Sequence, residues 1–410
     1  MGVMEELFER ALHLEKPWRI SGIELREAEK LLEIRLDFPK GSRFPCPRCG
    51  GECGAYDTAD KRWRHFNFFE HECHLIARVP RISCETDGIA TIDVPWARPG
   101  SGFTLLYEAL LMMLAGEMPV MAVSRVAKVS DDRLWRMLDY WVGRAREYAD
   151  HSGVSRIGID ETAAKRGHDY ITIVADLDGR KVIYATEGRD GGTVESFVHD
   201  FMEHSGDIDN LTDLSMDMSP AFIAGAEENL PHVPVTFDRF HTMKVVNDAV
   251  DRVRKEESAD THHLKKLRYV FLRNREKLTA SQRKSLAVLE SMPKLNLKTV
   301  RALHIRENLQ SVYQEADRDR FERALKRWYF WATHSRLPPM VEAARTIKRH
   351  WSGVLRWFDS RVTNGILEGM SSLIQSAKAK ARGYRTSRNF ITIIYLILGK
   401  LDYAGAGLPT

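Results

Sequence analysis

Three acidic residues lie in sequence contexts that suit a divalent-metal site. Asp160 and Asp217 each end an apolar run typical of a buried strand, and Glu368 lies in a segment with helical spacing. Cleavage of a phosphodiester without a covalent intermediate needs an activated water and a stabilised leaving oxygen, and two divalent ions about 4 Å apart supply both. Mg²⁺ or Mn²⁺ prefers carboxylates held on rigid elements. These acids therefore predict metal-dependent chemistry on phosphodiesters.

The elements expected around these acids form an α/β core with the order of a ribonuclease-H-like fold. In such a sheet the first and fourth strands lie side by side, which would bring Asp160 to Asp217, and a helix crossing the sheet would add Glu368. Glu161, Asp176 and Asp178 remain alternatives, and adjacent strand residues point to opposite faces. Three antiparallel strands are expected first, then two strands alternating with helices, over residues 156–161, 170–176, 181–186, 211–217 and 233–237.

The cysteines predict a second metal site near the start of the chain. All five lie between residues 46 and 84, and in a reducing compartment such clustering favours metal over disulfides. Cys46 and Cys49 form a glycine-flanked turn that can point two thiolates at one tetrahedral Zn²⁺. A second turn of similar shape offers Cys84 and, in the last ligand position, Asp87. Another cysteine or a nearby histidine remains an alternative fourth ligand.

Residues 103–148 have the pattern of three short helices. Breaks at Pro119 and Ser130 separate them, which gives the layout of a helix-turn-helix. The third helix would be the recognition element and would present Arg133 and Arg136 to phosphates or bases of double-stranded DNA. A three-helix bundle of another kind would give the same pattern.

The charge of the chain is distributed unevenly. Residues 1–240 have a net charge of −13, and residues 241–410 have a net charge of +17, which indicates a surface that meets a polyanion. Trp328 and Trp331 in this basic part would either stack on an unpaired base or pack in a core. A basic run after Glu368 is expected to grip the DNA backbone through Lys378, Lys380, Arg382, Arg385 and Arg388.

These patterns divide the chain into a succession of domains. The catalytic core is expected in two parts that an all-helical insertion interrupts. The expected ranges are an N-terminal region with a zinc-ribbon-like module over 1–100, a helix-turn-helix over 101–150, the first part of the core over 151–240, the insertion over 241–350 and the last part of the core over 351–410.

Four segments that carry the candidate residues resemble the acidic-triad (DDE) transposases of the bacterial insertion-sequence family called ISL-three. They are residues 158–161, 215–220, 237–241 and 364–369, and the resemblance covers nearly the whole chain. It implies that Asp160, Asp217 and Glu368 bind the catalytic Mg²⁺ or Mn²⁺ ions. Residues 238–241 also resemble an aspartate-two-residues-histidine motif found near the active site in several related transposase groups, so His241 either approaches the scissile phosphate or has a packing role. The family resemblance also implies cleavage at transposon ends, strand transfer into target DNA, and a homodimer or higher homo-oligomer. The family's zinc ribbon usually has Cys or His where this chain has Asp87.

Other functions are compatible with the same residues. A DNA-binding regulator or a domesticated, catalytically silent transposase would keep the recognition elements, and a resolving or repair nuclease would keep the metal site. The chain lacks an apolar run long enough to span a bilayer and an N-terminal pattern of a signal peptide. We therefore expect a cytoplasmic protein associated with the nucleoid.

Overall fold

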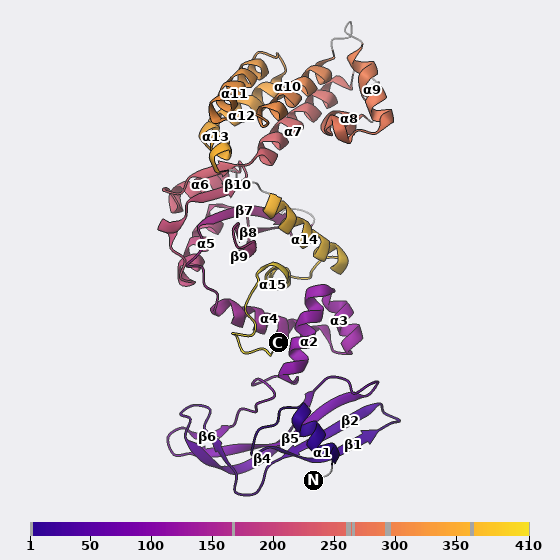
Figure 1. Ribbon diagram of the computed structural model, residues 1–410, viewed down its shortest axis with the longest axis vertical. Coiled ribbons are helices and arrows are strands. Elements are labelled where there is room, and N and C mark those ends of the chain that lie inside the picture. Colours follow the sequence, from indigo (N-terminus) through magenta and orange to yellow (C-terminus); the bar gives the residue numbers. More distant parts are fainter. Residues whose placement is uncertain are drawn as a thin grey trace. The chain divides into compact units, whose positions relative to one another are not determined.

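The computed structural model describes residues 3–165, 169–259, 264, 267–291, 297–360 and 365–409. The chain divides into two compact units, one comprising Met1–Ala149 with Leu401–Thr410 and the other comprising Asp150–Lys400. Figure 1 labels the elements of both units along the chain. Within the described ranges, none of the helices has the length and apolar character needed to cross a membrane.

The first unit begins with helix α1 (Val3–Ala11) and a six-stranded sheet. Burial alternates along the long strand β5, whose inward residues include Leu75 and Ala77, and these pack with Trp18, Trp63 and Trp96. The sheet order is β1-β2-β5-β4-β3, and β6 pairs with β5. The strands are β1 (Arg19–Arg26), β2 (Leu31–Asp37), β3 (Arg43–Pro45), β4 (Glu52–Arg64), β5 (Glu72–Cys84) and β6 (Gly88–Thr91).

Three helices follow in the same unit: α2 (Leu105–Glu117), α3 (Val120–Ala127) and α4 (Asp131–Glu147). The predicted breaks are confirmed, because Pro119 caps the start of α3 and Ser130 caps the start of α4. The fully buried carboxylate of Glu108 on α2 accepts a hydrogen bond of 2.7 Å from the indole of Trp141 on α4. Arg98 donates to the same carboxylate at 3.0 Å, so the buried charge is paired and fixes the two helices together.

A five-stranded sheet forms the start of the second unit, with the order β11-β10-β7-β8-β9. β7, β8 and β9 are antiparallel neighbours, whereas β10 lies parallel to both β7 and β11. The five predicted strands and the adjacency of the first and fourth are therefore confirmed. Helices α5 (Gly191–Glu203) and α6 (Pro220–Asn229) join them, and the strands are β7 (Arg156–Ala163), β8 (Tyr170–Asp176), β9 (Lys181–Glu187), β10 (Asp213–Met216) and β11 (Val235–Phe237).

Helices cover this sheet on both faces. Ile157 and Ile159 of β7 belong to the core that includes Val194 and Phe197 of α5. Gly158 lies between them and faces the opposite side, where Leu367 of helix α14 (Gly365–Ala381) packs closely against it. Helix α15 (Ser387–Leu398) packs on β9, where the backbone N–H of Ala185 donates to the hydroxyl of Tyr395 at 2.8 Å. The apolar side of α15 therefore packs against the sheet.

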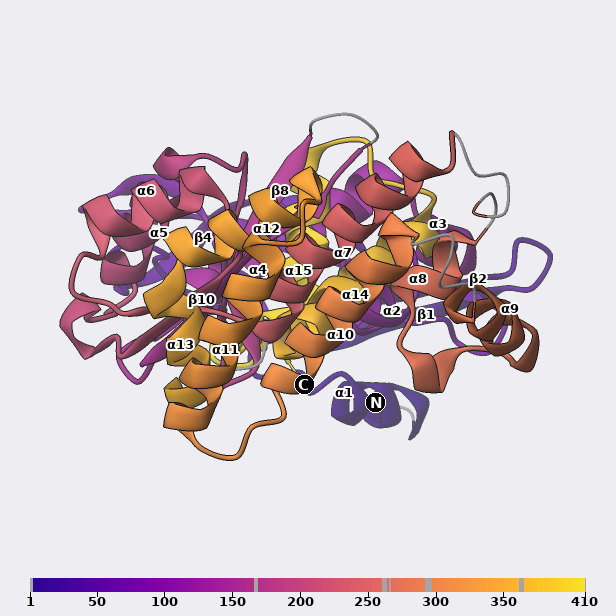
Figure 2. The ribbon, with the colours of Figure 1, turned by 90° about the horizontal axis from the view of Figure 1, so that it is seen from above.

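Between β11 and α14 the elements of the described residues are helical. α13 lies on the edge strand β11, because a Cβ atom at Gly353 would come within 2.5 Å of the Phe237 ring. Figures 1 and 2 show α7, α10, α11 and α12 side by side. The helices are α7 (Arg239–Glu257), α8 (Arg268–Leu272), α9 (Ala280–Glu290), α10 (Lys298–Val312), α11 (Arg318–Thr333), α12 (Pro338–Arg349) and α13 (Trp351–Ser360).

The tryptophans of these helices differ in exposure. Trp328 is fully buried, and its indole N–H donates to the carbonyl of Ile305 at 2.9 Å. The idea that Trp328 stacks on a base is therefore wrong, because its ring is part of the helical core. Trp331 is 43% exposed, so it is not a core residue. Stacking on an unpaired base remains a prediction for Trp331.

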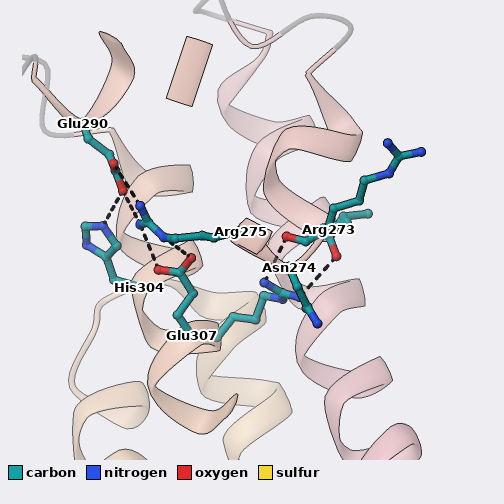
Figure 3. A network of polar contacts seen from close by, with 8 residues as sticks. Arg273, Asn274, Arg275, Glu290, His304 and Glu307 are labelled. Atoms are coloured by element: carbon teal, nitrogen blue, oxygen red, sulfur yellow. Dashed lines mark hydrogen bonds and ion pairs between the residues drawn. The ribbon is translucent and has the colours of Figure 1, made fainter. Parts of the chain in front are cut away.

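A polar network fixes the loop after α8. Figure 3 shows Arg275 between Glu290 of α9 and Glu307 of α10, with the Nε–Oε1 distance to Glu307 at 2.6 Å. His304 lies 3.2 Å from the Glu290 carboxylate. These contacts raise the pKa of Arg275 and lower that of Glu290. The network holds the loop that contains Asn274 against α10.

Candidate active site and nucleic-acid interface

Asp160 lies on β7 and is held by two hydrogen bonds. Its Oδ2 accepts from the hydroxyl of Ser371 on α14 at 2.8 Å, and its Oδ1 accepts from the backbone N–H of Glu161 at 2.8 Å. Burial raises the pKa of Asp160 against the effect of both hydrogen bonds, and the charge of Asp217 raises it further. A buried carboxylate with a raised pKa favours a nearby cation or a proton.

Asp217 reaches the same edge of the sheet from the neighbouring strand. Ser215 of β10 pairs in register with Gly158 of β7, so two residues further along both strands bring Asp217 and Asp160 to one end of a parallel pair. The Oδ1 of Asp217 accepts the backbone N–H of Ser219 at 2.9 Å. This bond holds the turn that starts α6 and orients the carboxylate.

Glu368 lies in the first turn of α14, one residue after the buried Leu367. A Cβ atom at Gly158 would lie 2.6 Å from Cδ1 of Leu367, so glycine is what lets the helix approach the strand this closely. Burial raises the pKa of Glu368, and the charges of Asp238 and then Asp160 raise it as well. The predicted triad thus shares one electrostatic environment.

His241 and Asp238 lie in contact with each other, and their charges act on these acids. Asp238 is buried directly after β11, where its Oδ1 accepts the backbone N–H of His241 at 3.0 Å and so caps α7. The same oxygen lies 3.2 Å from Nδ1 of His241. Burial alone would lower the pKa of His241, but Asp238 raises it above its usual value, and Asp217 and Asp160 add to this effect.

Asp238 lies in the segment 237–241 that carries part of the family resemblance, but no site role was predicted for it. Its signal was available, because it follows an apolar strand just as Asp217 does. Of the alternative acids, Glu161 is half-buried and has a pKa raised by burial and by Asp217. By contrast, Asp176 accepts backbone N–H groups of the β8–β9 turn, and Asp178 pairs with Arg156.

The donor set at this sheet edge fits a divalent metal. Asp160, Glu161 and Glu368 all have raised pKa values, first because burial disfavours their charged forms and second because neighbouring carboxylates repel their charges. Carboxylate oxygens on a strand and a helix are the hard donors that Mg²⁺ and Mn²⁺ prefer. The arrangement can therefore hold ions against a phosphodiester.

A cavity of about 520 Å³ opens beside Glu368. Asp238 and Glu368 lie at its acidic end. The other lining side chains include cations and amides, which are the groups that bind phosphates and base edges. They are Arg239, Asn247, Asn274, Lys277, Arg306 and Gln310. Arg306 is itself held by hydrogen bonds of 2.7 Å to Asn247 and 2.8 Å to Asn274.

The predicted DNA-binding residues after Glu368 are of two kinds. Lys378 faces the sheet, and its Nζ donates to the backbone carbonyl of Ala163 at 2.6 Å. The structure therefore gives this lysine a part in docking α14. The others are exposed at the end of α14 and before and within the first turn of α15, and they are Lys380, Arg382, Arg385 and Arg388.

Arg133 and Arg136 lie on the first two turns of α4, in the first unit. The Arg133 guanidinium lies 4.1 Å from the centroid of the Phe103 ring and donates to the carbonyl of Gly102 at 3.3 Å. Arg136 donates through Nε to the carbonyl of Asp132 at 3.3 Å. Both side chains are exposed on this helix, so each retains N–H groups that face solvent.

The cysteine cluster assembles as the spacing predicts. Donor atoms of Cys46, Cys49, Cys84 and Asp87 all lie within 4.8 Å of one another. Glycines with positive φ, Gly50 at 74° and Gly88 at 74°, shape the two turns that carry them. Three sulfurs and one carboxylate around one point form a donor set for tetrahedral Zn²⁺.

The protonation of this cluster also fits a cation. The backbone N–H of Gly51 favours the thiolate of Cys49, but Asp87, Cys84 and Cys46 raise its pKa to about 12. The four donors of this cluster repel one another when they are deprotonated. A bound metal ion replaces their protons and balances their negative charges.

Comparison with protein families gives three matches along the chain. A model of the ISL3 DDE domain, described as a transposase, matches residues 157–394. A model described as the helix-turn-helix domain of transposase family ISL3 matches residues 92–142. A third, described as the zinc-finger of transposase IS204/IS1001/IS1096/IS1165, matches residues 42–87.

Individual proteins also resemble the chain. It is 27% identical over 390 residues to the transposase for insertion sequence element IS1557 of Mycobacterium tuberculosis, covering 86% of this chain and 85% of that protein. It is 24% identical over 387 residues to the transposase for IS1001 of Bordetella parapertussis, covering 91% and 94%. The solved Drosophila P element transposase strand transfer complex matches with a TM-score of 0.42 and 12% identity, covering 75% of this chain and 94% of that one. With the transposase-domain model matching residues 157–394 and the two others matching the N-terminal motifs, the chain belongs to the ISL3 (ISL-three) family of transposases.

Proposed function

We propose that this DDE transposase cleaves DNA at transposon ends and transfers the freed strand to target DNA at a site made by Asp160, Asp217 and Glu368. The observation that carries the proposal is the meeting of β7, β10 and α14 at one sheet edge, where Asp160 and Glu368 have raised pKa values. The acids would hold Mg²⁺ or Mn²⁺. When bound, these ions activate the attacking oxygen and stabilise the leaving oxygen in both steps.

The residues of the chain contribute position and charge to this chemistry. Ser371 and the Glu161 N–H orient the Asp160 carboxylate, so that both of its oxygens are fixed. His241, whose pKa Asp238 raises against the effect of burial, would approach the scissile phosphate and, when protonated, offset its negative charge. The water attacks in the first step and the 3′-hydroxyl in the second, each losing its proton at this acidic edge.

DNA recognition is proposed to use separate surfaces. Arg133 and Arg136 would contact the terminal inverted repeats from α4 as a recognition helix. The exposed basic run would hold the backbone near the acids, through Lys380, Arg382, Arg385 and Arg388, with Lys378 acting through the helix that it docks. Because two transposon ends must be held together, we propose a homodimer or higher homo-oligomer. Its proposed location is the cytoplasm, where it acts on the DNA of the nucleoid.

Zn²⁺ is proposed to bind Cys46, Cys49, Cys84 and Asp87 and to stabilise the fold of the zinc ribbon. The support is the single cluster that their donor atoms form within 4.8 Å. An aspartate as the fourth ligand departs from the usual Cys or His but offers an oxygen that zinc accepts.

The fold of the second unit is proposed to be ribonuclease-H-like with a helical insertion. The strand order β11-β10-β7-β8-β9 supports the first part, and the helices between β11 and α14 support the second. We keep the domain ranges 1–100, 101–150, 151–240, 241–350 and 351–410 as the proposed division.

The test is magnesium-dependent cleavage of a duplex that carries the element's own terminal repeat. Wild type is compared with Asp217→Asn and Glu368→Gln, and DNA binding is measured alongside. We expect wild type to cut and both variants to bind without cutting. If all three bind equally and none cuts, the protein is a DNA-binding regulator or a catalytically silent transposase. Cleavage without strand transfer would instead indicate a resolving or repair nuclease.

A further inference from the structure

Among the described residues, the imidazole ring of a buried histidine near the start of the second unit makes no hydrogen bond. His151 is only 4% exposed, and neither of its ring nitrogens is hydrogen-bonded within the described ranges. Its ring stacks on Phe201 with centroids 5.9 Å apart and an interplanar angle of 16°. Leaving two polar nitrogens buried and unpaired is costly, so an additional ligand at this position would satisfy them.

Two further donors lie next to His151. Asp200 and His204 are four residues apart at the end of α5, so they project from the same side of that helix. One donor atom from each of the three side chains lies within 4.8 Å of the other two. The backbone N–H of His151 donates to the carbonyl of His204 at 2.8 Å, which holds the two segments together.

The ring nitrogens of the cluster suit metal binding. A neutral imidazole has a lone pair to donate to an ion, and within the described part of the chain no hydrogen bond occupies either ring nitrogen of His151. His204 is oriented by a contact of 2.7 Å between its Nδ1 and the Asp200 carbonyl, the kind of outer bond that fixes a ligating imidazole.

We propose that His151, Asp200 and His204 bind a Zn²⁺-class divalent ion, which ties the first residues of the second unit to the end of α5. Two imidazoles and one carboxylate are a donor set of zinc sites, whereas Mg²⁺ prefers oxygen donors alone. This ion would be distinct from those at the catalytic acids and at the cysteine cluster. Its role is structural, since it anchors the chain directly after the unit that ends at Ala149.

The first test measures zinc stoichiometry in the full-length protein by elemental analysis and native mass spectrometry after dialysis against Zn²⁺. His151→Phe keeps an aromatic ring next to Phe201 but removes both nitrogens. We expect this variant to bind one zinc fewer than wild type, and Cys49→Ser to lose a different ion. His199→Gln, one residue before Asp200 and exposed, is the matched control and should bind as wild type does.

Replacement of zinc by Co²⁺ separates the two sites spectroscopically. Sulfur-to-cobalt absorption should disappear in Cys49→Ser and persist in His151→Phe, because only the cysteine cluster contains thiolates. If His151→Phe fails to fold, Asp200→Asn serves instead and should weaken binding of the second zinc by about tenfold or more.

Thermal unfolding provides a second test of the zinc site and shows which results would overturn the proposal. A zinc-dependent rise in Tm should be smaller in His151→Phe than in the His199→Gln control. If His151→Phe and Asp200→Asn both bind as many zinc ions as the control with the same affinity, the proposal is overturned. A rise in the Tm of His151→Phe with unchanged zinc would identify His151 as a packing residue.

Discussion

The hydroxyl of Ser371 donates a hydrogen bond of 2.8 Å to Oδ2 of Asp160. This bond joins the helix that carries Glu368 to the strand that carries Asp160, so two of the three proposed metal ligands are positioned by one contact. Two more residues on the same face of α14 bond to β7. Gln375 donates a hydrogen bond to the hydroxyl of Thr162, and Lys378 donates one to the carbonyl of Ala163. The helix is thereby held in register along β7, and Glu368 is fixed one turn before Ser371.

Asp160→Asn should stabilise the metal-free protein while abolishing cleavage. Because burial raises the pKa of Asp160, the folded protein binds a proton at this carboxylate more tightly than the unfolded chain does. Protonation of Asp160 therefore stabilises the fold fully below the unfolded pKa, and this stabilisation is lost as pH rises through the higher folded pKa. At pH 7 the charged carboxylate is therefore destabilising, and asparagine removes that charge. We expect Tm in EDTA at pH 7 to rise by about 2 °C, the effect of roughly 1 kcal/mol in a unit of this size.

Scanning fluorimetry with and without Mg²⁺ checks this prediction. Mg²⁺ should raise the Tm of wild type and leave that of Asp160→Asn unchanged. The control is Asp178→Asn, which breaks the ion pair with Arg156 in the β8–β9 turn and should leave cleavage intact. A lower Tm for Asp160→Asn than for wild type in EDTA would contradict the prediction.

Gly158→Ala should displace α14 and reduce cleavage. A methyl group there would lie 2.6 Å from Cδ1 of Leu367 and 3.0 Å from Cδ2 of Leu177, so the Leu367 side chain or the helix that carries it must shift. Overpacking of this kind costs about 1–3 kcal/mol, and misplacing Glu368 should lower the cleavage rate by about tenfold or more. Denaturant unfolding and a cleavage time course measure the two effects.

A double-mutant cycle isolates the cause of this loss. In a Leu367→Ala background the methyl group loses its nearest obstacle and meets only Leu177 at 3.0 Å, so Gly158→Ala should cost less there than in wild type. Gly153→Ala is the control, because a Cβ at Gly153 meets no atom within 4 Å. An equal cost of Gly158→Ala in both backgrounds would show that Leu367 is not the obstacle.

The arrangement of the acids on the sheet could be predicted because it depends on strand order. Alternation of apolar residues located the five strands, and the order of an α/β core then placed Asp160 beside Asp217. The segment that contains Asp238 was identified, but no role was predicted for its carboxylate, which caps a helix and contacts His241. Neither contact leaves a periodic signal in the sequence.

The roles of the basic and aromatic residues after the sheet were harder to predict. Lys378 lies seven residues after Ser371 and four after the buried Ile374, so the spacing placed it on the inward face of α14. Charge alone suggested a DNA contact instead. Trp328 was ambiguous for a related reason, since an aromatic side chain serves a core and a base stack equally well, and only tertiary packing decides.

Lys378→Gln and Lys380→Gln should separate docking of the helix from DNA binding. Lys378 donates to the carbonyl of Ala163, so its loss should lower stability by about 1.5–3 kcal/mol, as for a charge-assisted hydrogen bond, and leave the salt dependence of DNA binding unchanged. Lys380 is exposed, so its loss should reduce the slope of log K against log salt by about 1 and leave Tm unchanged.

Fluorescence anisotropy with terminal-repeat DNA at several salt concentrations, together with thermal unfolding, checks both variants. Each serves as the control for the other, because both remove one positive charge from the same helix two residues apart. The assignment fails if Lys378→Gln lowers the salt slope while Tm stays the same.

The stability contributed by His241 should depend on pH. Asp238, Asp217 and Asp160 raise its pKa although burial opposes them. The contribution is therefore complete below the unfolded pKa of about 6.5 and is lost as pH rises through the higher folded pKa. His241→Gln should thus cost more at pH 6 than at pH 9, by about 1 kcal/mol in the free energy of unfolding.

Urea unfolding in EDTA at both pH values measures this difference. Asp238→Asn keeps a side chain that caps α7 but removes the charge that faces His241. Asp238→Asn should lose the same pH-dependent part of the free energy of unfolding as His241→Gln. The double variant should lose no more of it than either single variant, because both changes remove the same ion pair. A cost of His241→Gln that is equal at pH 6 and pH 9 would mean that the imidazole is not charged in the folded protein, and His241 would then be a packing residue beside the acids.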